Sequence, residues 1–406
     1  MATVEVRIER LGHQGDGIAD GPVFAARTLP GEQVSGALSG QSLHDVKILE
    51  PSADRVHPPC RHYRACGGCQ LQHASDDFVV RWKQEIVENA LKSHGLETKF
   101  RPIAISPSRS RRRATFAVRR TKKGAMAGFH GRASDVITEI PDCQLLHPDL
   151  RAALPIAEAL APLGASRKAP LAVTVTRSNS GLDISVQGGK PLDGALHMSL
   201  AQFASTHDLA RLTWNDEPVA SRRPPIQSFG SADVVPPPGA FLQATAEGEA
   251  ALVSAVLEIA ESAKRTVDLF AGCGTFTLPL ARTSEVHGVE GDREMTKALD
   301  HGWRHGQGLK KVTTEARDLF RRPLMPDELK RFDTAVIDPP RAGAEAQIAE
   351  LAESGVTRIA HVSCNPVSFA RDAATLCKAG FTLDWVQVVD QFRWSVHTEL
   401  VASFSR

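Results

Sequence analysis

The feature that most constrains the fold is a regular alternation of strand-like and helix-like segments through the second half of the 406-residue chain. The strand-like runs cover 265–270, 285–292, 311–318, 332–338 and 357–364, and the helical patterns cover 244–263, 293–306, 344–354 and 367–378. Such alternation predicts parallel strands, because each helix returns the chain to the same end of the sheet. We therefore predict a doubly wound α/β domain here.

The first half of the chain is patterned differently. Residues 2–50 read as short strands separated by Gly-rich turns, which predicts a small barrel. Residues 76–92 repeat apolar side chains at every fourth position and predict a helix. The Pro-rich stretch 222–239 predicts a connector. These features divide the chain into a barrel, a mixed α+β central domain and an α/β domain, which cover residues 1–50, 51–240 and 241–406.

Composition limits the class of protein. The chain has a net charge of +1, seven cysteines and no apolar run long enough to cross a membrane. Its first ten residues carry four charges, where a signal peptide would need an apolar core. Clustered cysteines in a leaderless chain indicate metal binding or catalysis rather than disulfides. We therefore expect a soluble cytoplasmic protein, with no membrane association and no obligate protein partner.

The charge distribution is uneven. Residues 101–132 contain ten basic residues and no acidic residue, whereas the rest of the chain has 38 basic against 47 acidic residues. A dense basic segment on an otherwise acidic protein can anchor phosphates, which favours a nucleic-acid partner. The alternative is a solvated basic hairpin that binds nothing.

A Gly-rich turn marks the first candidate binding site. Gly272 and Gly274 lie between a predicted strand, which ends near Asp268, and the following helix. Glycines at that place let the backbone approach a nucleotide-like ligand. Glu290 ends the next strand, where an acidic group accepts hydrogen bonds from ribose hydroxyls. Gly-rich turns also occur without a ligand, so the acid at the matching distance strengthens the prediction.

Two further polar groups end neighbouring strands. Asp338 begins the run DPPR and Cys364 lies in SCNP, just before a predicted helix. Ligands of open α/β sheets bind at the carboxyl ends of the strands. A cysteine before a helix N-terminus is expected to gain thiolate character, although a buried structural thiol is the alternative. For Asp338 the alternative is a stiff turn with an Asp cap.

Two more groups suggest chemistry. Glu399 begins the last predicted strand and could serve as a base, whereas a solvent-facing Glu is the simpler interpretation. Four cysteines could hold a metal, and three of them lie within ten residues: Cys60, Cys66, Cys69 and the distant Cys143. Four thiolates suit either a zinc ion or an iron–sulfur cluster, and their spacing does not separate the two.

The order of FLQ, DLFAGCGTF, GVEGD, DPPRAG, SCNP and HxE resembles the RNA (uracil-5-)-methyltransferase family, most strongly over residues 241–406. The form DxFxGxG is similar to the S-adenosylmethionine site of Rossmann-like methyltransferases. The resemblance implies that Cys364 is the nucleophile and Glu399 the base. It also implies a set of residues that line the S-adenosylmethionine site, namely Gln243, Phe270, Thr275, Glu290, Asp318 and Asp338.

The resemblance extends to the first half. Residues 2–50 are similar to a TRAM domain, an OB-like barrel that binds RNA, and the run CxxxxxCGGC implies a [4Fe-4S] cluster on the four cysteines rather than zinc. The implied activity is methylation of C5 of a uridine, with 23S rRNA favoured over the T-loop of tRNA. Two rival hypotheses are a methyltransferase that acts on another RNA atom, such as an exocyclic amine, and a catalytically inactive iron–sulfur protein that binds RNA.

Overall fold

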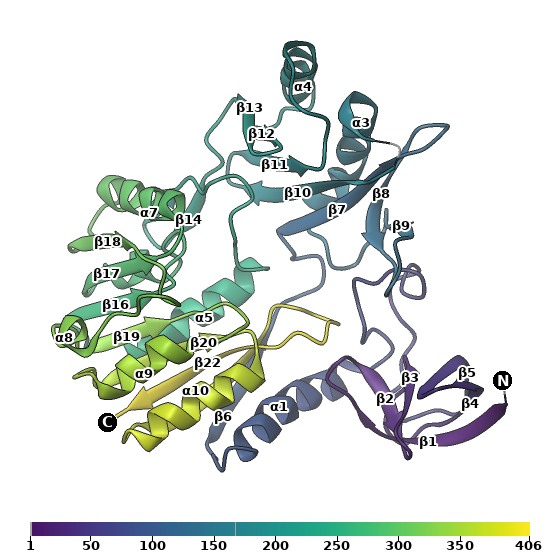
Figure 1. Cartoon of the computed structure of the whole chain (residues 1–406), viewed down its shortest axis with the longest axis horizontal. Coiled ribbons are helices and arrows are strands. Elements are labelled where there is room, and N and C mark those ends of the chain that lie inside the picture. Colours follow the sequence, from purple (N-terminus) through teal and green to yellow (C-terminus); the bar gives the residue numbers. More distant parts are fainter. Residues whose placement is uncertain (1, 167) are drawn as a thin grey trace. The chain divides into compact units, whose positions relative to one another are not determined.

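The structure is a computed structural model that describes residues 2–166 and 168–406 (Figure 1). The chain forms two compact units. The first unit contains residues 1–86, 129–144 and 394–397, and the second contains residues 87–128, 145–393 and 398–406. Each unit is thus assembled from segments that lie far apart in the sequence.

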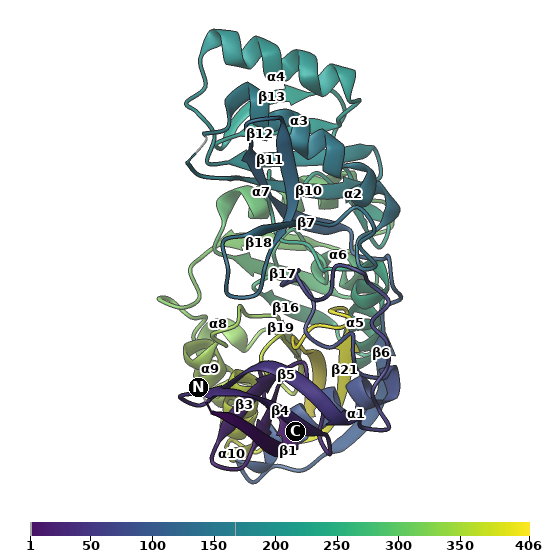
Figure 2. The same cartoon turned by 90° about the vertical axis from the view of Figure 1, so that its right-hand side faces the viewer.

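The first unit begins with a closed barrel of five strands in the order β1-β2-β3-β5-β4 (Figure 2). The strands are β1 (Thr3–Leu11), β2 (Asp16–Ala19), β3 (Val23–Ala26), β4 (Gln33–Ser39) and β5 (Ser42–Glu50). A small core that includes Ile8, Val34 and Leu43 fills the barrel. The predicted N-terminal barrel is confirmed.

A Cys-rich segment without regular structure follows the barrel and leads into helix α1 (Asp76–Lys92). The predicted helix is therefore confirmed with its predicted bounds. Val79 and Trp82 of α1 are buried in the first unit against Leu11, Leu29 and Leu71.

A seven-stranded sheet has the order β13-β12-β11-β10-β7-β8-β9, and its strands from β13 to β7 lie in the second unit. Its strands are β7 (Arg113–Arg120), β8 (Ala125–His130), β9 (Ile137–Glu139), β10 (Leu171–Ser178), β11 (Gly181–Gln187), β12 (Arg211–Trp214) and β13 (Glu217–Ser221). The accompanying helices are α2 (Pro148–Ala152), α3 (Leu154–Gly164) and α4 (Gly194–Thr206). The predicted connector 222–239 contains a short hairpin of β14 (Gln227–Phe229) and β15 (Ala232–Val234).

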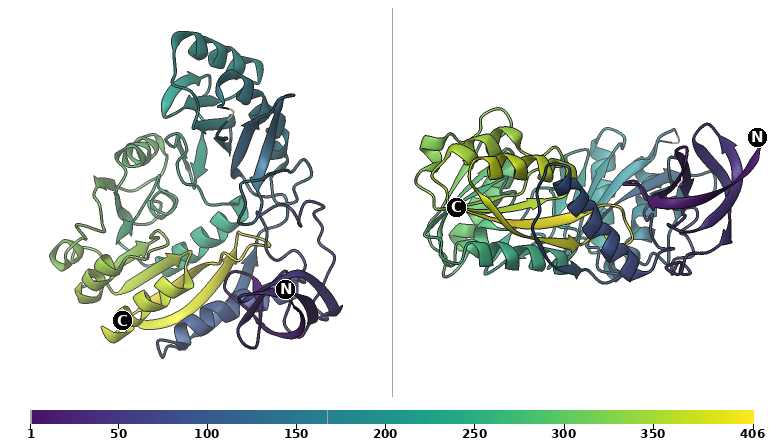
Figure 3. Two further views of the ribbon diagram at one scale, coloured as in Figure 1. Left: turned by 45° about the vertical axis from the view of Figure 1, so that its right-hand side comes forward. Right: turned by 90° about the horizontal axis from the view of Figure 1, so that it is seen from below.

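The predicted α/β domain is an eight-stranded sheet in the order β18-β17-β16-β19-β20-β22-β21-β6. Its strands are β6 (Lys99–Ile105), β16 (Arg265–Leu269), β17 (Glu285–Glu290), β18 (Val312–Ala316), β19 (Thr334–Ile337), β20 (Arg358–Ser363), β21 (Thr382–Asp390) and β22 (Glu399–Ser405). The five strands from β18 to β20 are parallel, as predicted, and β22 runs antiparallel to both of its neighbours. Figure 3 shows β21 and β22 side by side in yellow.

Helices cover both faces of this sheet (Figure 1). They are α5 (Ala246–Ile259), α6 (Thr277–Leu280), α7 (Arg293–His305), α8 (Pro326–Leu329), α9 (Glu345–Glu353) and α10 (Pro366–Lys378). Along β19, Ala335 and Ile337 belong to the core beneath α9 and α10, whereas Val336 belongs to the core beneath α5. Because successive side chains point to opposite faces, a strand buried on both faces must be apolar throughout.

Two details differ from the sequence-based prediction. Strand β6 pairs with β21 at the sheet edge, although it lies far before residue 241. The helix predicted after the Gly-rich turn is only the four residues of α6, because the chain from Gly272 to Phe276 forms turns instead. Propensity did not reveal β6, since its edge position depends on tertiary packing.

Within the part of the chain that the structure describes, no helix has both the length and the apolar character needed to cross a membrane.

Candidate active site

The candidate site lies where the strand order of the eight-stranded sheet reverses. From β16 the chain proceeds outward to β17 and β18, and from β19 it proceeds in the other direction to β20. Ligands of open α/β sheets bind outside the carboxyl ends of the strands at such a reversal. Asp268, near the end of β16, and Asp338, just after β19, therefore flank the predicted crevice.

The Gly-rich turn after β16 requires its glycines. Gly272 and Gly274 have φ of 56° and 98°, a region that favours glycine. A Cβ on Gly274 would also lie 2.4 Å from Cδ1 of Leu299. Phe270 has φ of 63°, which is uncommon for an aromatic residue, and Thr275 is half-buried in the same turn. The backbone thus makes the tight turn that the sequence predicted.

Glu290 is bound to this turn. The Gly272 N–H donates to its Oε2 at 3.0 Å, and the Asp292 N–H donates to its Oε1 at 2.9 Å. Each carboxylate oxygen keeps a second lone pair that could accept a hydrogen bond from a ligand hydroxyl. Strand register explains the placement, because the end of β17 pairs with the end of β16.

Asp318 lies on the surface after β18. Its Oδ1 accepts a hydrogen bond from the Phe320 N–H at 3.0 Å. This turn brings the Phe320 ring to 5.4 Å from the Phe270 ring, centroid to centroid. Phe320 is 49% exposed, so an aromatic surface borders the Gly-rich turn.

A chain of buried hydrogen bonds joins Asp338 to Glu399. Gln243 Nε2 donates to Asp338 Oδ2 at 3.4 Å, and Gln391 Nε2 donates to Gln243 Oε1 at 2.6 Å. Gln391 Nε2 also donates to Glu399 Oε2 at 3.0 Å. Glu399 is only 3% exposed, so the interpretation of a solvent-facing Glu is wrong.

Burial raises the pKa of each carboxyl group at this place. Burial, and then the charge of Asp268, raises the pKa of Asp338 to about 7. Burial raises the pKa of Asp268 to about 7, against the hydrogen bond from Thr277 Oγ1 at 2.5 Å. Burial and Asp338 together raise the pKa of Glu399 to about 8. Three carboxyl groups that titrate near neutrality can exchange protons, and a bound cation would favour their charged forms.

Cys364 is half-buried just after β20 and interacts electrostatically with both Glu399 and Asp338. Burial, Glu399 and Asp338 raise the pKa of its thiol to about 11, and only the charge of Arg341 among neighbouring side chains opposes them. The expectation of thiolate character from the helix N-terminus is therefore wrong for the protein without ligands. Two carboxylates and desolvation outweigh the helix dipole, which acts only over the first turn.

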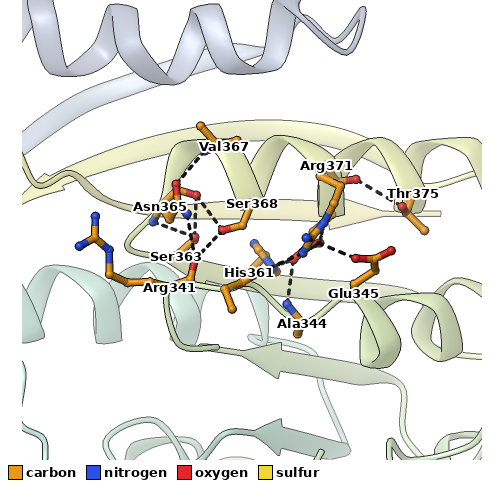
Figure 4. A network of polar contacts seen from close by, with 12 residues as sticks. Arg341, Ala344, Glu345, His361, Ser363, Asn365, Val367, Ser368, Arg371 and Thr375 are labelled. Carbon is orange, nitrogen blue, oxygen red and sulfur yellow. Dashed lines mark hydrogen bonds and ion pairs between the residues drawn. The ribbon is translucent and has the colours of Figure 1, made fainter. Parts of the chain in front are cut away.

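The DPPR and SCNP loops are held together (Figure 4). Asn365 caps α10 by accepting a hydrogen bond from the Val367 N–H, and its Nδ2 donates to the Arg341 carbonyl at 2.8 Å. Ser368 Oγ donates to the same carbonyl at 3.2 Å. The loop that carries Asp338 is thereby fixed against the loop that carries Cys364.

The four cysteines lie together in the first unit, apart from these residues in sequence. Cys66 interacts electrostatically with Cys60 and Cys143, and Cys69 interacts with all three of the others. Burial, and then these neighbouring thiols, raises the pKa of Cys69 to about 12, against a hydrogen bond from Gln72. No three His, Cys, Asp or Glu side chains of the described residues are arranged as ligands of a metal ion. Four thiols are a suitable donor set for a metal that binds thiolates. Their positions in the structure do not match the arrangement of metal ligands.

The Cys-rich segment also contacts the loop that precedes Glu399. The Gln70 and Leu71 N–H groups both donate to the Trp394 carbonyl at 2.9 Å. The buried Lys83 of α1 donates to the His397 carbonyl at 2.9 Å. These hydrogen bonds mean that the conformation of residues 394–397 depends on the conformation of the Cys-rich segment.

Comparison with known proteins now identifies the family. A family model described as tRNA (Uracil-5-)-methyltransferase matches residues 307–405. A protein of Rhizobium meliloti (strain 1021), named as an uncharacterized RNA methyltransferase, is 45% identical over 415 residues and covers 100% of both chains. The 23S rRNA (uracil(1939)-C(5))-methyltransferase RlmD of Chromohalobacter salexigens is 32% identical, over 98% of this chain and 88% of that protein. The chain belongs to the RNA (uracil-5-)-methyltransferase family.

A solved structure shares the fold of this chain. The crystal structure of Pyrococcus abyssi tRNA (uracil-54, C5)-methyltransferase with S-adenosyl-L-homocysteine matches with a TM-score of 0.77 and 22% identity, and covers 98% of this chain and 99% of that one. This likeness confirms the methyltransferase fold. The family member described here is an S-adenosylmethionine-dependent RNA methyltransferase.

One residue of the site, Gln391, was missed by sequence reasoning. Gln391 lies in the run DQFRW and has no local signal, since only folding brings it between Gln243 and Glu399. Asp268 was already visible as the strand-end acid of the Gly-rich motif. The structure adds that its buried Oδ1 has no hydrogen-bond partner in the described residues.

The basic segment 101–132 is partly used inside the protein. Arg101 and Arg132 form ion pairs with Glu258 and Asp16, with nitrogen–oxygen distances of 2.6 Å in each. Arg112 forms an ion pair with Glu249, and its Nε donates to the Gln243 carbonyl at 3.0 Å. Arg112 therefore supports the site, and the segment offers fewer cations to phosphates than its composition suggested.

We predict that Glu399→Gln increases the reactivity of Cys364. At pH 9, above the pKa of about 8 of Glu399, its charge opposes thiolate formation, so removal of the charge lowers the pKa of the thiol. Alkylation of Cys364 by iodoacetamide, followed by peptide mass spectrometry, should become roughly tenfold faster, which corresponds to about one pH unit.

Cys377 is an internal control for this experiment. Burial alone raises the pKa of its thiol, with no carboxylate among the causes, so its alkylation rate should not change. Equal acceleration of both cysteines would indicate general loosening and contradict the prediction.

Proposed function

We propose that this chain transfers a methyl group from S-adenosylmethionine to C5 of a uridine in RNA, with 23S rRNA as the favoured substrate. The observation that carries the proposal is the grouping of Cys364, Glu399 and Asp338 at the strand reversal of the sheet. This reaction requires a nucleophile, a base that can change its protonation near neutral pH, and an acidic group beside the methyl donor.

The chemistry assigns a role to each group. C5 of uracil is a poor nucleophile, so the Cys364 thiolate first forms an S–C6 bond, and the resulting enolate attacks the donor methyl group from C5. The methyl–sulfur bond of the donor breaks and S-adenosylhomocysteine leaves. Glu399 then removes the C5 proton, and the S–C6 bond breaks to release 5-methyluridine and the thiolate. A stacked base cannot be reached in this way, so the uridine must be flipped out.

The donor would occupy the crevice between β16 and β19. The residues proposed to line it are Gln243, Phe270, Thr275, Glu290, Asp318 and Asp338. Asp338 is suited to a donor that carries a positive sulfonium, because an opposite charge favours the ionised carboxyl. The same positive charge would lower the pKa of the Cys364 thiol, which is too high in the protein alone.

The choice of RNA rests on the relatives. The chain is similar over nearly its whole length to a protein named for 23S rRNA, whereas the tRNA enzyme from Pyrococcus abyssi shares the fold at lower identity. Methylation of a T-loop uridine in tRNA is therefore the second candidate. An inactive RNA-binding protein is disfavoured, since Cys364, Glu399 and Asp338 are all present and close together.

RNA would be held by both units. In the first unit a cavity of about 990 Å³ beside the TRAM-like barrel is lined in part by His44, His57, Arg27 and Arg64. In the second unit Lys122 and Lys123 are exposed at the turn between β7 and β8. The arginine and lysine side chains suit the phosphates of the RNA backbone, which contribute most of the affinity.

We further propose that Cys60, Cys66, Cys69 and Cys143 hold a [4Fe-4S] cluster. The support is their mutual proximity and a donor set of four thiols, for which zinc is the alternative. The cluster would supply a structural link between residues 60–69 and 143. Since Gln70 and Leu71 contact Trp394, the link would also order residues 394–397.

The first prediction concerns the substrate. Purified protein should convert uridine to 5-methyluridine in unmodified 23S rRNA, measured by mass spectrometry of digested nucleosides after incubation with S-adenosylmethionine. A matched pool of unmodified tRNA should remain free of the product. Product in tRNA alone would overturn the favoured substrate but keep the chemistry, and product in neither RNA would contradict the proposed function.

The second prediction concerns the base. Glu399→Gln should reduce turnover by about 10²- to 10⁴-fold, the usual contribution of a general base. It should also accumulate a covalent adduct between protein and ordinary RNA, seen as a shifted band on a denaturing gel. Cys364→Ala should form no adduct, and an adduct that survives in that variant would refute the assignment of the nucleophile.

The third prediction concerns the metal. Anaerobically purified protein should be brown, with absorbance in the blue region and with iron and sulfide by chemical assay. Cys66→Ser should lose both, whereas Cys377→Ser, outside the four-cysteine group, should keep them. Stoichiometric zinc without iron would decide for the alternative.

A further inference from the structure

We infer that Gln391 is a positioning residue that sets the orientation of the Glu399 carboxylate and ties it to Gln243. This inference rests on the proposed function, because it assumes that Glu399 removes the C5 proton. It goes beyond that function by giving a role to Gln391, a residue that the motifs of the family resemblance do not include.

The orientation of the Gln391 amide is fixed by a backbone donor. The Ala244 N–H donates to Gln391 Oε1 at 2.8 Å. A backbone N–H can only donate, so this end of the amide must be the oxygen. The amide NH₂ group must then face the other way, where both of its hydrogen bonds are found.

Those two bonds connect the donor side to the base. Gln391 Nε2 lies 2.6 Å from Gln243 Oε1 and 3.0 Å from Glu399 Oε2. Since Gln243 Oε1 already accepts from Gln391, the Gln243 NH₂ group is directed to Asp338, 3.4 Å away. The direction of every bond thus follows from the Ala244 N–H.

The local packing is built around Gln391. Its side chain is 3% exposed, and Gln243 and Glu399 are 2% and 3% exposed. A Cβ on Gly248, in the first turn of α5, would lie 2.6 Å from Cβ of Gln391. Glycine at this helical position leaves room for Gln391, although it lowers helix propensity. Water has little access here to replace a lost hydrogen bond, so the network is sensitive to loss of one member.

Gln391 also opposes the other influences on Glu399. The charged or titratable groups that face Glu399 are Asp338 from the end of β19 and Cys364 from the end of β20. Asp338 and burial favour the protonated form of Glu399, whereas the N–H of Gln391 favours the carboxylate. Gln391 is therefore the neighbour that keeps the base available near neutral pH.

The test is Gln391→Met, which keeps the length of the side chain and removes its hydrogen bonds. The matched control is Gln387→Met on β21, four residues before Gln391, because the Gln387 amide donates to the Pro102 carbonyl and not to Gln243 or Glu399 among the described contacts. Turnover is measured against pH with saturating RNA and S-adenosylmethionine. The acid limb is the part of this profile in which turnover rises with pH as the base loses its proton. In Gln391→Met we expect this limb to move about one unit to higher pH, so that turnover at a given pH on the limb is roughly tenfold lower.

Adduct formation with 5-fluorouridine RNA separates this inference from the proposed function. The adduct needs Cys364 and methyl transfer but no base, because C5 carries no proton to remove. Gln391→Met should form it at the level of the unmutated protein. Failure of the unmutated protein to form it would overturn the proposed function, whereas a normal adduct with an unshifted acid limb in Gln391→Met would overturn the role of Gln391 alone.

A second variant covers loss of folding in Gln391→Met. Gln391→Glu keeps the size of the side chain and an acceptor for the Ala244 N–H, and it places another carboxyl beside Glu399. We expect its acid limb to move in the same direction and at least as far. An acid limb equal to that of Gln387→Met would overturn the inference.

Discussion

The burial of carboxyl groups at one point of the sheet is the constraint on which the rest of the structure depends. Asp268, Asp338 and Glu399 all have raised pKa values because they are removed from water, and Asp338 also faces the other two. A buried charge is costly unless it is paired or hydrogen-bonded. The protein meets this cost with a few neutral donors, notably Thr277, Gln243 and Gln391. The carboxyl oxygens that these donors leave free are suited to a positively charged methyl donor and to proton transfer.

The sheet makes this arrangement possible. Its central strands, such as β19, are buried on both faces, so helices pack on each side and the polar groups of the site lie at the strand ends. The reversal between β16 and β19 separates the loops at that edge and leaves space for a ligand. The DPPR and SCNP loops are then locked to each other through Asn365 and Ser368. These hydrogen bonds fix the position of the loop that carries Asp338 relative to the loop that carries Cys364.

The thiol of Cys364 shows how a site can be incomplete without its substrates. Its pKa of about 11 in the protein alone would leave little thiolate near neutral pH. The same carboxylates that raise this pKa are those proposed to hold the donor and to remove the C5 proton. In the proposed reaction, the positive charge of the donor would therefore lower the pKa of the Cys364 thiol, so donor binding would favour the thiolate.

Much of this could be read from the sequence. The strand–helix alternation, the Gly-rich turn and the strand-end residues Glu290, Asp338 and Cys364 are local patterns, and local patterns determine which elements form. The barrel and α1 were predicted for the same reason. The family resemblance supplied the proposed roles of Cys364 and Glu399, which spacing alone does not imply.

Tertiary structure alone decided the rest, because it depends on which distant segments meet. Strand β6 joins the sheet edge beside β21, and Gln391 comes between Gln243 and Glu399, although neither has a distinctive local sequence. The protonation of Cys364 also depends on tertiary structure. Desolvation and nearby charges raise the pKa of its thiol, whereas its position before a helix N-terminus predicted a lower pKa. Sequence determined the chemical groups that are present, and packing determined their neighbours and therefore their charge.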